Sequence, residues 1–170
     1  MSIRSDAACV RVLDSPEATR AAGAELGRAL VAESDGGPWL VGLEGDLGAG
    51  KTTYVAGVLC ALGHADAVRS PTYTFIEPYR LADRDIYHCD LYRIRSAAEV
   101  EELGLRELAA HESLLLIEWP SRAAGQLGEL DLRVQLEYGS NGDDRRLTLA
   151  ADSARGARLL ERLARQRITS

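Results

Sequence analysis

The sequence predicts an α/β fold of three layers, in which a mixed central β-sheet is flanked by helices. Three observations lead to this expectation. Short apolar runs typical of buried strands alternate with longer amphipathic segments typical of helices. A glycine-rich loop joins one such strand directly to one such helix, and two late segments alternate apolar and polar residues around a turn. The length of 170 residues, with 46% hydrophobic and 27% charged side chains, is ordinary for a globular domain, and we expect residues 1–170 to form a single domain.

The first predicted elements precede the glycine-rich loop. Residues 10–13 predict a short strand. A helix is then expected from Pro16 to about residue 33, because Ser15 can cap it and proline is favoured at the first helical position. Residues 34–38 are rich in glycine and end with proline, so they should end this helix. The apolar residues 39–44 predict a buried strand that runs straight into the loop.

The segment after the loop predicts a second helix, from Lys51 to its natural C-terminal cap at Gly63. Residues 70–76 and 86–92 are rich in aromatic and β-branched side chains and predict a hairpin or two neighbouring strands. Ser96 and Glu99 form a capping box at the start of a further helix. The remaining elements expected are that helix over 96–110, an apolar central strand over 114–117, a hairpin of strands 132–138 and 146–150, and a final helix over 153–167.

Charge and composition exclude several classes of protein. The formal charge of −6 and the pI near 5.1 count against direct gripping of a nucleic acid backbone. No apolar run approaches the roughly 18 residues that a membrane helix needs, and the first ten residues lack the features of a secretory signal. We therefore expect a cytoplasmic protein without membrane contact.

The cysteines and the arginines of the C-terminus receive ordinary structural interpretations. Cys9, Cys60 and Cys89 are odd in number and widely spaced, which indicates reduced packing residues rather than a disulfide or a metal site. Five arginines near the C-terminus have the spacing of the solvated face of a helix, and a docking surface for a partner is the alternative. These are Arg155, Arg158, Arg162, Arg165 and Arg167.

The residues that carry chemistry begin with a complete phosphate-binding motif, G-x4-G-K-[ST], over residues 45–52. Lys51 is the only lysine of the chain, and every other basic residue among the twenty is an arginine. Backbone N–H groups of such a loop, together with the N-terminus of the following helix, surround phosphate oxygens. Lys51 should neutralise the β- and γ-phosphates, and the Thr52 hydroxyl should bind Mg²⁺. The predicted nucleotide-binding residues are Asp46, Leu47, Gly48, Ala49, Gly50, Lys51, Thr52 and Thr53.

Two acidic residues end predicted strands and are candidates for the rest of the site. Glu118 follows residues 114–117, and Asp90 closes the apolar part of residues 86–92. A P-loop enzyme needs a carboxylate near Mg²⁺ at the end of a strand, and a second carboxylate can orient or deprotonate the attacking water. The spacing does not decide which residue has which role.

Other polar residues leave alternatives open. Ser70, Thr72 and Thr74 lie where such proteins sense the γ-phosphate, although a strand entry with incidental hydroxyls is equally compatible with the spacing. Trp119 with its following proline indicates a lid or a partner contact. His64, His88 and His111 share no spacing and are interpreted as structural or exposed residues.

Taken together, four segments in this order and spacing resemble the TsaE (YjeE) family of small bacterial ATPases. They are Gly45-Asp46-Leu47-Gly48-Ala49-Gly50-Lys51-Thr52-Thr53, Ser70-Pro71-Thr72-Tyr73-Thr74-Phe75, Tyr87-His88-Cys89-Asp90-Leu91-Tyr92-Arg93 and Ile117-Glu118-Trp119-Pro120. The resemblance implies a P-loop NTPase-like fold and Mg²⁺-dependent ATP hydrolysis. It further implies a role in forming threonylcarbamoyladenosine in tRNAs that read codons beginning with adenine. The partner would be a TsaB–TsaD heterodimer, in which TsaD transfers the group and through which tRNA is reached indirectly.

The resemblance also implies roles for individual residues. Lys51 and Asp90 would be catalytic, with Asp90 acting on water, while Thr52 and Glu118 would complete the metal shell. Thr19 would contact the nucleotide base, and Arg146 would approach the nucleotide. Cys89 stands where the family commonly has phenylalanine, a change in packing that leaves the site intact.

Two other functions fit a P-loop in a chain of this size. A small-molecule or nucleoside kinase should carry an arginine-bearing lid helix and an acceptor pocket, whereas residues 99–107 are rich in acids. A nucleotide-sensing module that does not hydrolyse its ligand needs fewer carboxylates than the pair Asp90 and Glu118. Hydrolysis of ATP is therefore the expectation that the residues favour.

Overall fold

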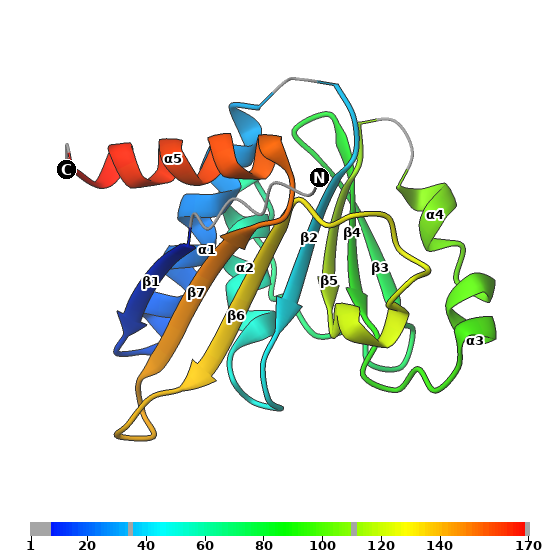
Figure 1. Ribbon diagram of the computed structural model, residues 1–170, viewed down its shortest axis with the longest axis horizontal. Helices are drawn as coiled ribbons and strands as arrows, with labels where there is room; N and C mark the ends of the chain where they lie inside the picture. The colour runs from blue at the N-terminus through cyan, green and yellow to red at the C-terminus, as the bar shows by residue number, and fades with distance from the viewer. Residues whose placement is uncertain (1–7, 34–35, 110–111, 169–170) are drawn as a thin grey trace, which may run out of the picture.

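A single seven-stranded sheet organises the chain, whose computed structural model describes residues 8–33, 36–109 and 112–168. Its strand order is β1-β7-β6-β2-β5-β4-β3, and Figure 1 shows the strands side by side from β1 to β3. The four strands β6, β2, β5 and β4 are parallel, while β1, β7 and β3 pair with their neighbours in the antiparallel sense. The mixed sheet predicted from the sequence is confirmed. The elements are β1 (Ala8–Leu13), α1 (Pro16–Val31), β2 (Trp39–Glu44), α2 (Lys51–Ala61), β3 (Ile76–Leu81), β4 (Arg84–Asp90), α3 (Ala97–Glu102), α4 (Leu105–Leu108), β5 (Leu114–Glu118), the 3₁₀ helix η1 (Pro120–Ala123), β6 (Leu132–Tyr138), β7 (Arg145–Ala151) and α5 (Ala154–Ile168).

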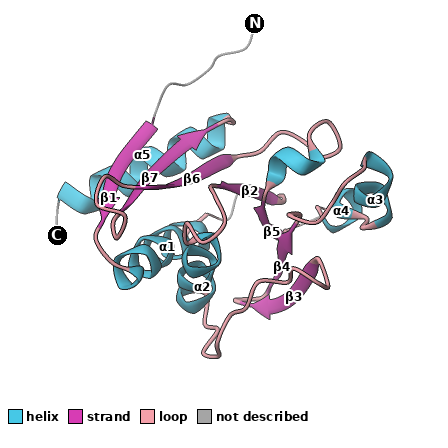
Figure 2. Cartoon of the chain, turned by 90° about the horizontal axis from the view of Figure 1, so that it is seen from below, coloured by secondary structure: helices cyan, strands magenta, loops and turns pink. Residues whose placement is uncertain are grey.

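Helices cover both faces of the sheet, which gives the three layers. Figure 2 shows α1 and α2 together on one side, and α3 with α4 beside β4 and β5 on the other. In β5, Leu114 and Leu116 belong to the core beneath α1 and α2, whereas Leu115 and Ile117 belong to the core beneath α3 and α4. A strand buried on both faces is expected to be apolar throughout, and all five residues of β5 are buried.

Helices α1 and α2 lie unusually close together because glycines form their contact. A Cβ atom on Gly23 would stand 2.0 Å from the Tyr54 carbonyl oxygen, and one on Gly57 would stand 1.9 Å from that of Arg20. Only glycine therefore allows the two backbones to approach to this distance. Because α2 begins at the glycine-rich loop, this contact fixes the helix that carries the loop.

The segment predicted as a strand over residues 70–76 is a loop up to Phe75, and only its last residue belongs to β3. Phe75 has φ 64°, outside the range of a strand, and its N–H donates to the Pro71 carbonyl. The hydroxyls of Ser70 and Thr72 bind Asp90 instead of solvent. The hairpin alternative is correct for β3 and β4, which join through Ala82 and Asp83 in left-handed conformations, as a two-residue turn requires.

The helix predicted over residues 96–110 is two short helices, α3 and α4, and residue 110 lies outside the described residues. Gly104 interrupts the helix in a left-handed conformation, with φ 63°. One half of the capping box is confirmed, because Ser96 Oγ accepts from the Glu99 N–H. The Glu99 carboxylate accepts instead from the N–H of Arg95, one residue before the N-cap, and from the Ser96 hydroxyl. The sequence therefore indicated the start of the helix correctly and missed its interruption.

The arginines of α5 do not share one solvated face. Arg155 is half-buried, donates from Nε and Nη2 to both oxygens of Asp131 at 2.7 and 2.6 Å, and lies over the Trp39 ring. Arg162 pairs with Glu33 at 2.6 Å. Both residues attach α5 to the rest of the fold, so the prediction of a solvated face is wrong for them.

Across the three described stretches, every helix is too short or too polar to span a lipid bilayer.

Candidate functional site

The glycine-rich loop lies between the C-terminal end of β2 and the first residue of α2, as the sequence predicts. Gly45, Gly48 and Gly50 all have positive φ angles, of 147°, 79° and 104°, which glycine adopts without a steric penalty. Gly50 is the N-cap of α2, and no side chain caps the helix. The first N–H groups of α2 are thus available for an anion, in agreement with the positive end of the helix dipole.

Lys51 lies buried against its own loop, with 4% of its surface exposed. Its Nζ donates to the carbonyls of Gly45 and Asp46 at 2.6 and 3.0 Å, and lies 4.2 Å from the centroid of the Trp119 ring. Burial lowers the pKa of the ammonium group, and the negative charges of Glu118, Asp90 and two further acids oppose this effect only in part. An arriving phosphate would stabilise the charged form of Lys51 and so raise this pKa again.

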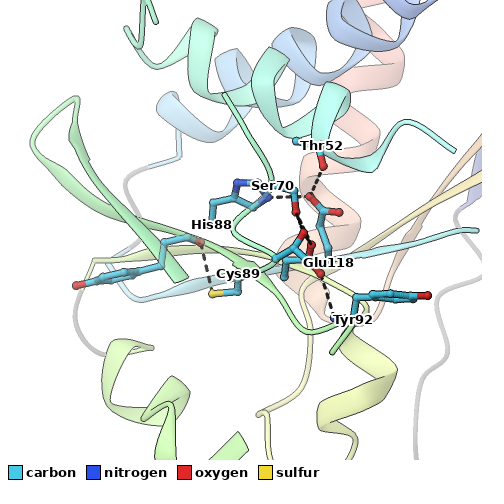
Figure 3. Close-up of polar contacts among 9 residues, drawn as sticks. Thr52, Ser70, His88, Cys89, Tyr92 and Glu118 are labelled. Carbon is cyan, nitrogen blue, oxygen red and sulfur yellow. Dashed lines mark hydrogen bonds and ion pairs between the residues drawn. The ribbon is translucent and has the colours of Figure 1, made fainter. Parts of the chain in front are cut away.

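Glu118 forms the link between the sheet and the loop. Its Oε1 accepts a hydrogen bond from the Thr52 hydroxyl at 2.8 Å and lies 2.8 Å from His88 Nε2. Figure 3 shows Thr52 and the His88 ring reaching Glu118 from two different directions. Glu118 is 3% exposed, so these two contacts lie in the interior of the protein. The carboxylate therefore lies beside the hydroxyl that P-loops use to bind Mg²⁺.

Asp90 is held by a different set of donors. Its Oδ2 accepts from the hydroxyls of Ser70 and Thr72, the latter at 2.9 Å, and its Oδ1 accepts from the Tyr92 N–H at 3.0 Å. The loop before β3 thus joins the end of β4 through these hydroxyls. The hydroxyls of Ser70 and Thr72 thus bind a candidate site residue, while Thr74 is exposed. Sensing of the γ-phosphate by these residues stays a prediction.

The two acids are register neighbours at the ends of adjacent parallel strands, because Asp90 of β4 pairs with Glu118 of β5. Both line a pocket of about 300 Å³ beside the glycine-rich loop. The other lining residues are Leu47, Gly48, Gly50, Lys51, Thr52, Thr53, Ser70, Thr72, Tyr92 and Trp119. The strand ends have brought together residues that are far apart in the sequence, as expected for a parallel sheet.

The donor set of this pocket fits a hard divalent cation. Asp90 and Glu118 are buried carboxylates, with exposed fractions of 4% and 3%, and Thr52 adds a hydroxyl oxygen. Oxygen ligands of this kind suit Mg²⁺. Two buried acids face a single lysine here, so further positive charge would be favourable. If such a cation binds, Thr52 and Glu118 would be the residues to hold it, because their oxygen atoms lie next to each other beside the loop.

Thr19 and Arg146, the two nucleotide contacts implied by the resemblance alone, do not line this pocket. Thr19 is buried at the start of α1, and its hydroxyl donates to the Ser15 carbonyl at 3.2 Å. Its methyl group lies next to Gly50, 3.4 Å from where a Cβ atom would stand. Arg146 is an exposed residue of β7. Both assignments stay predictions.

Two residues contact the site although the sequence did not predict it. His88 was interpreted as structural or exposed; it is fully buried, in agreement with the first of these, and it also contacts Glu118. Its position two residues before Asp90, on the same face of a strand, could have indicated this. Tyr138, at the end of β6, donates from its hydroxyl to the Leu47 carbonyl of the loop at 2.9 Å. No signal in the sequence connects that hairpin to the loop.

Trp119 lines the pocket in a strained backbone conformation, with φ 59°. The Trp119 ring lies over the Lys51 ammonium group, and its centroid is 5.2 Å from the centroid of the Tyr92 ring. A non-glycine residue in this region is uncommon and is often found at functional sites. The lid and the partner contact that the sequence left open for Trp119 both stay predictions.

Comparison with known proteins gives one family. The family model described as "Threonylcarbamoyl adenosine biosynthesis protein TsaE" matches residues 13–147. A relative from Haemophilus influenzae is 42% identical over 121 residues, covering 71% of this chain and 75% of its own length. One from Bacillus subtilis is 36% identical over 151 residues, covering 89% and 90%. Both are named tRNA threonylcarbamoyladenosine biosynthesis protein TsaE. The crystal structure of YdiB from Bacillus subtilis is similar with a TM-score of 0.72 at 29% identity, covering 94% of this chain and 95% of that one.

Proposed function

Because the chain belongs to the TsaE family, we propose that it is a Mg²⁺-dependent P-loop ATPase that supports the formation of threonylcarbamoyladenosine in tRNA. The observation that carries the ATPase proposal is the contact of 2.8 Å between the Thr52 hydroxyl and the buried Glu118 carboxylate. It joins the phosphate-binding loop to a strand-end acid, with Asp90 on the neighbouring strand. A loop that only held phosphate would not need this pair of acids.

The glycine-rich loop binds the triphosphate. Its backbone N–H groups and the uncapped N-terminus of α2 surround the phosphate oxygens. Lys51 exchanges its bonds to the carbonyls of Gly45 and Asp46 for contacts with the β- and γ-phosphates, and its charge opposes the negative charge that grows during transfer. Thr52 and Glu118 hold Mg²⁺, which supplies neutralisation of phosphate charge when it is bound.

Asp90 acts on the attacking water. Three donors fix its carboxylate, namely the hydroxyls of Ser70 and Thr72 and the N–H of Tyr92. The carboxylate is therefore oriented before the substrate arrives. Glu118 instead contacts the hydroxyl that accompanies the metal. This difference in partners favours Glu118 as the metal ligand and Asp90 as the residue that orients or deprotonates water.

The proposed partners follow from the family. The chain acts with a TsaB–TsaD heterodimer in the cytoplasm, TsaD transfers the threonylcarbamoyl group, and ATP turnover by this chain permits repeated rounds. The net charge of −6 agrees with a protein that reaches tRNA through partners and not through its own surface.

The test measures phosphate release from ATP by the purified chain, with and without a TsaB–TsaD pair. We expect slow release that needs Mg²⁺ and increases with the pair. Lys51→Ala should abolish nucleotide binding, while Asp90→Asn should keep binding and lose about 100-fold or more in turnover. Asp83→Asn makes the same chemical change at the exposed turn between β3 and β4 and should leave both quantities unchanged.

Three outcomes would contradict the proposal. Transfer of the γ-phosphate to a small acceptor without free phosphate would indicate a kinase. Tight binding without turnover, even with partners, would indicate a nucleotide-sensing module. Equal loss of binding in Lys51→Ala and Asp90→Asn would contradict the separate roles of these residues.

A further inference from the structure

His88 is a fully buried histidine that makes one polar contact, with Glu118. It belongs to β4 and has no exposed surface. Its Nε2 lies 2.8 Å from Glu118 Oε1, while its Nδ1 is buried without a hydrogen-bond partner among the described residues. A buried polar atom without a partner has a free-energy cost. The Glu118 contact is therefore the interaction that keeps an imidazole at this position.

The asymmetry of the ring indicates which nitrogen carries hydrogen. If Nδ1 carried it, a donor would be buried unpaired and Nε2 would present a lone pair to a carboxylate oxygen. With hydrogen on Nε2, the ring donates to Glu118 and only an acceptor remains unpaired, the less costly arrangement. Figure 3 shows the His88 ring directed at Glu118 along this contact.

Both donors to Glu118 converge on one oxygen. The Thr52 hydroxyl and His88 Nε2 each lie 2.8 Å from Oε1. Two donors from different elements, α2 and β4, define the plane and rotation of the carboxylate much better than one. If the Thr52 hydroxyl bound a metal ion, His88 would be the donor that still holds Glu118 from the sheet side. The same arrangement, in which an outer residue orients a metal ligand, is general in metal sites.

We propose that His88 is a positioning residue, whose Nε2–H holds the Glu118 carboxylate in the orientation that binds the Mg²⁺ of the nucleotide complex. The proposal rests on the proposed function, because it assumes that Glu118 is a metal ligand. It assigns to His88 an effect on the binding of Mg²⁺ with nucleotide, and no direct contact with either.

The chain offers a matched set of substitutions to test this role. His88→Gln can place an N–H near the position of Nε2, whereas the shorter His88→Asn is equally polar and cannot reach Glu118. His88→Leu fills the space without a donor. The measured quantity is the dissociation constant of a fluorescent ATP analogue, once with Mg²⁺ and once with EDTA, with thermal melting as the check on folding.

We expect the gain in affinity that Mg²⁺ gives the wild-type protein to fall by about 10-fold or more in His88→Asn and His88→Leu. His88→Gln should keep most of this gain, and the constants in EDTA should agree within about twofold for all variants. His64→Gln, a change at a half-buried histidine that packs on Tyr79, should behave as wild type. Equal weakening with and without Mg²⁺, or full retention of the gain in His88→Leu, would overturn the proposal.

A measurement on the unmodified side chain keeps the proposal testable if the variants do not fold. Long-range ¹⁵N–¹H NMR spectra distinguish the two tautomers of a neutral imidazole, and substitution of the other two histidines assigns the His88 signals. We expect hydrogen on Nε2, and a change in its signals when Mg²⁺ is added to the nucleotide complex. Hydrogen on Nδ1 with a bare Nε2 would overturn the proposal. If Mg²⁺ does not increase the nucleotide affinity of the wild-type protein, the proposed function fails. The tautomer measurement would still show whether His88 donates to Glu118.

Discussion

Lys51 is a cation that the fold keeps largely out of water, and its charge therefore depends on what lies beside it. Burial lowers its pKa below the ordinary value of 10.5, with the nearby acids opposing the shift only in part. A bound triphosphate stabilises the charged ammonium and raises this pKa. Between the lowered pKa and that of the complex, the complex holds more hydrogen ions than the free protein. Nucleotide affinity must therefore decrease as pH rises through this window.

We predict that the dissociation constant for the Mg²⁺-free nucleotide increases with pH in the alkaline range below 10.5, accompanied by uptake of hydrogen ions on binding. Titration calorimetry in two buffers of different ionisation enthalpy measures the uptake directly. Melting of the protein across the same range controls for loss of the fold. Release of hydrogen ions on binding, or a constant affinity up to pH 10.5, would contradict the assignment of a lowered pKa to Lys51.

Cys60 and Cys89 should differ in reactivity because they differ in burial. Cys60 is exposed, whereas Cys89 is buried in the core on the α3 and α4 side, and burial raises the pKa of its thiol to about 12. Since the thiolate is the reactive form, a disulfide reagent at pH 8 should modify Cys60 quickly and Cys89 only after unfolding. Cys60→Ser serves as the control, since it should remove the fast phase. A fast phase that persists in that variant and maps to Cys89 would contradict the burial of this residue.

At the scale of elements, the glycines of α1 and α2 decide how closely these helices approach. A substitution of glycine by alanine inside a helix normally stabilises it by about 1 kcal/mol. We predict the opposite for Gly57→Ala, because its Cβ would lie 1.9 Å from the Arg20 carbonyl oxygen. The helices must separate, at a cost on the order of 1–3 kcal/mol. Urea unfolding measures the change, and an increase in the free energy of unfolding would contradict the close packing.

The control for this prediction is Gly128→Ala, where a Cβ atom meets nothing within 4 Å. This substitution should change the free energy of unfolding by no more than about 0.5 kcal/mol. Gly57→Ala should also weaken nucleotide binding, since α2 carries Lys51 and Thr52 at its N-terminus. Equal effects of the two substitutions would show that the separation of α1 and α2 has no influence on stability.

The loop before β3 should affect turnover more than nucleotide binding, because its hydroxyls touch Asp90 and not the glycine-rich loop. We predict that Thr72→Val, which removes the bond of 2.9 Å to Asp90 Oδ2 at nearly constant volume, lowers the turnover number by up to about 100-fold. The dissociation constant for nucleotide should change by less than about threefold. Thr74→Val, at an exposed position of the same loop, is the matched control. A loss confined to nucleotide affinity would remove Asp90 from the proposed role.

At the scale of the whole molecule, the sequence predicted what local patterns determine. The order of strands and helices follows from apolar periodicity, and the P-loop follows from its motif. Both could therefore be predicted from the sequence. The roles of Asp90 and Glu118 could not be separated, because they depend on which side chains lie opposite across the sheet. The break at Gly104 and the loop before β3 were missed since both depend on single left-handed residues. The contact of His88 with Glu118 was also missed, because the two residues lie thirty positions apart in the sequence.

The site combines β2, α2, β4 and β5 with the loop before β3, so ligand binding should stabilise the fold as a unit. A ligand that binds only the folded state at 100 times its dissociation constant adds about 2.7 kcal/mol to the free energy of unfolding. For a chain of this size, we predict a rise in Tm of about 5–10 °C. Differential scanning fluorimetry with Mg²⁺ and a non-hydrolysable ATP analogue measures it. Lys51→Ala should melt near the wild-type temperature without ligand and show no rise with it. A rise that survives in Lys51→Ala would place the ligand somewhere other than the glycine-rich loop.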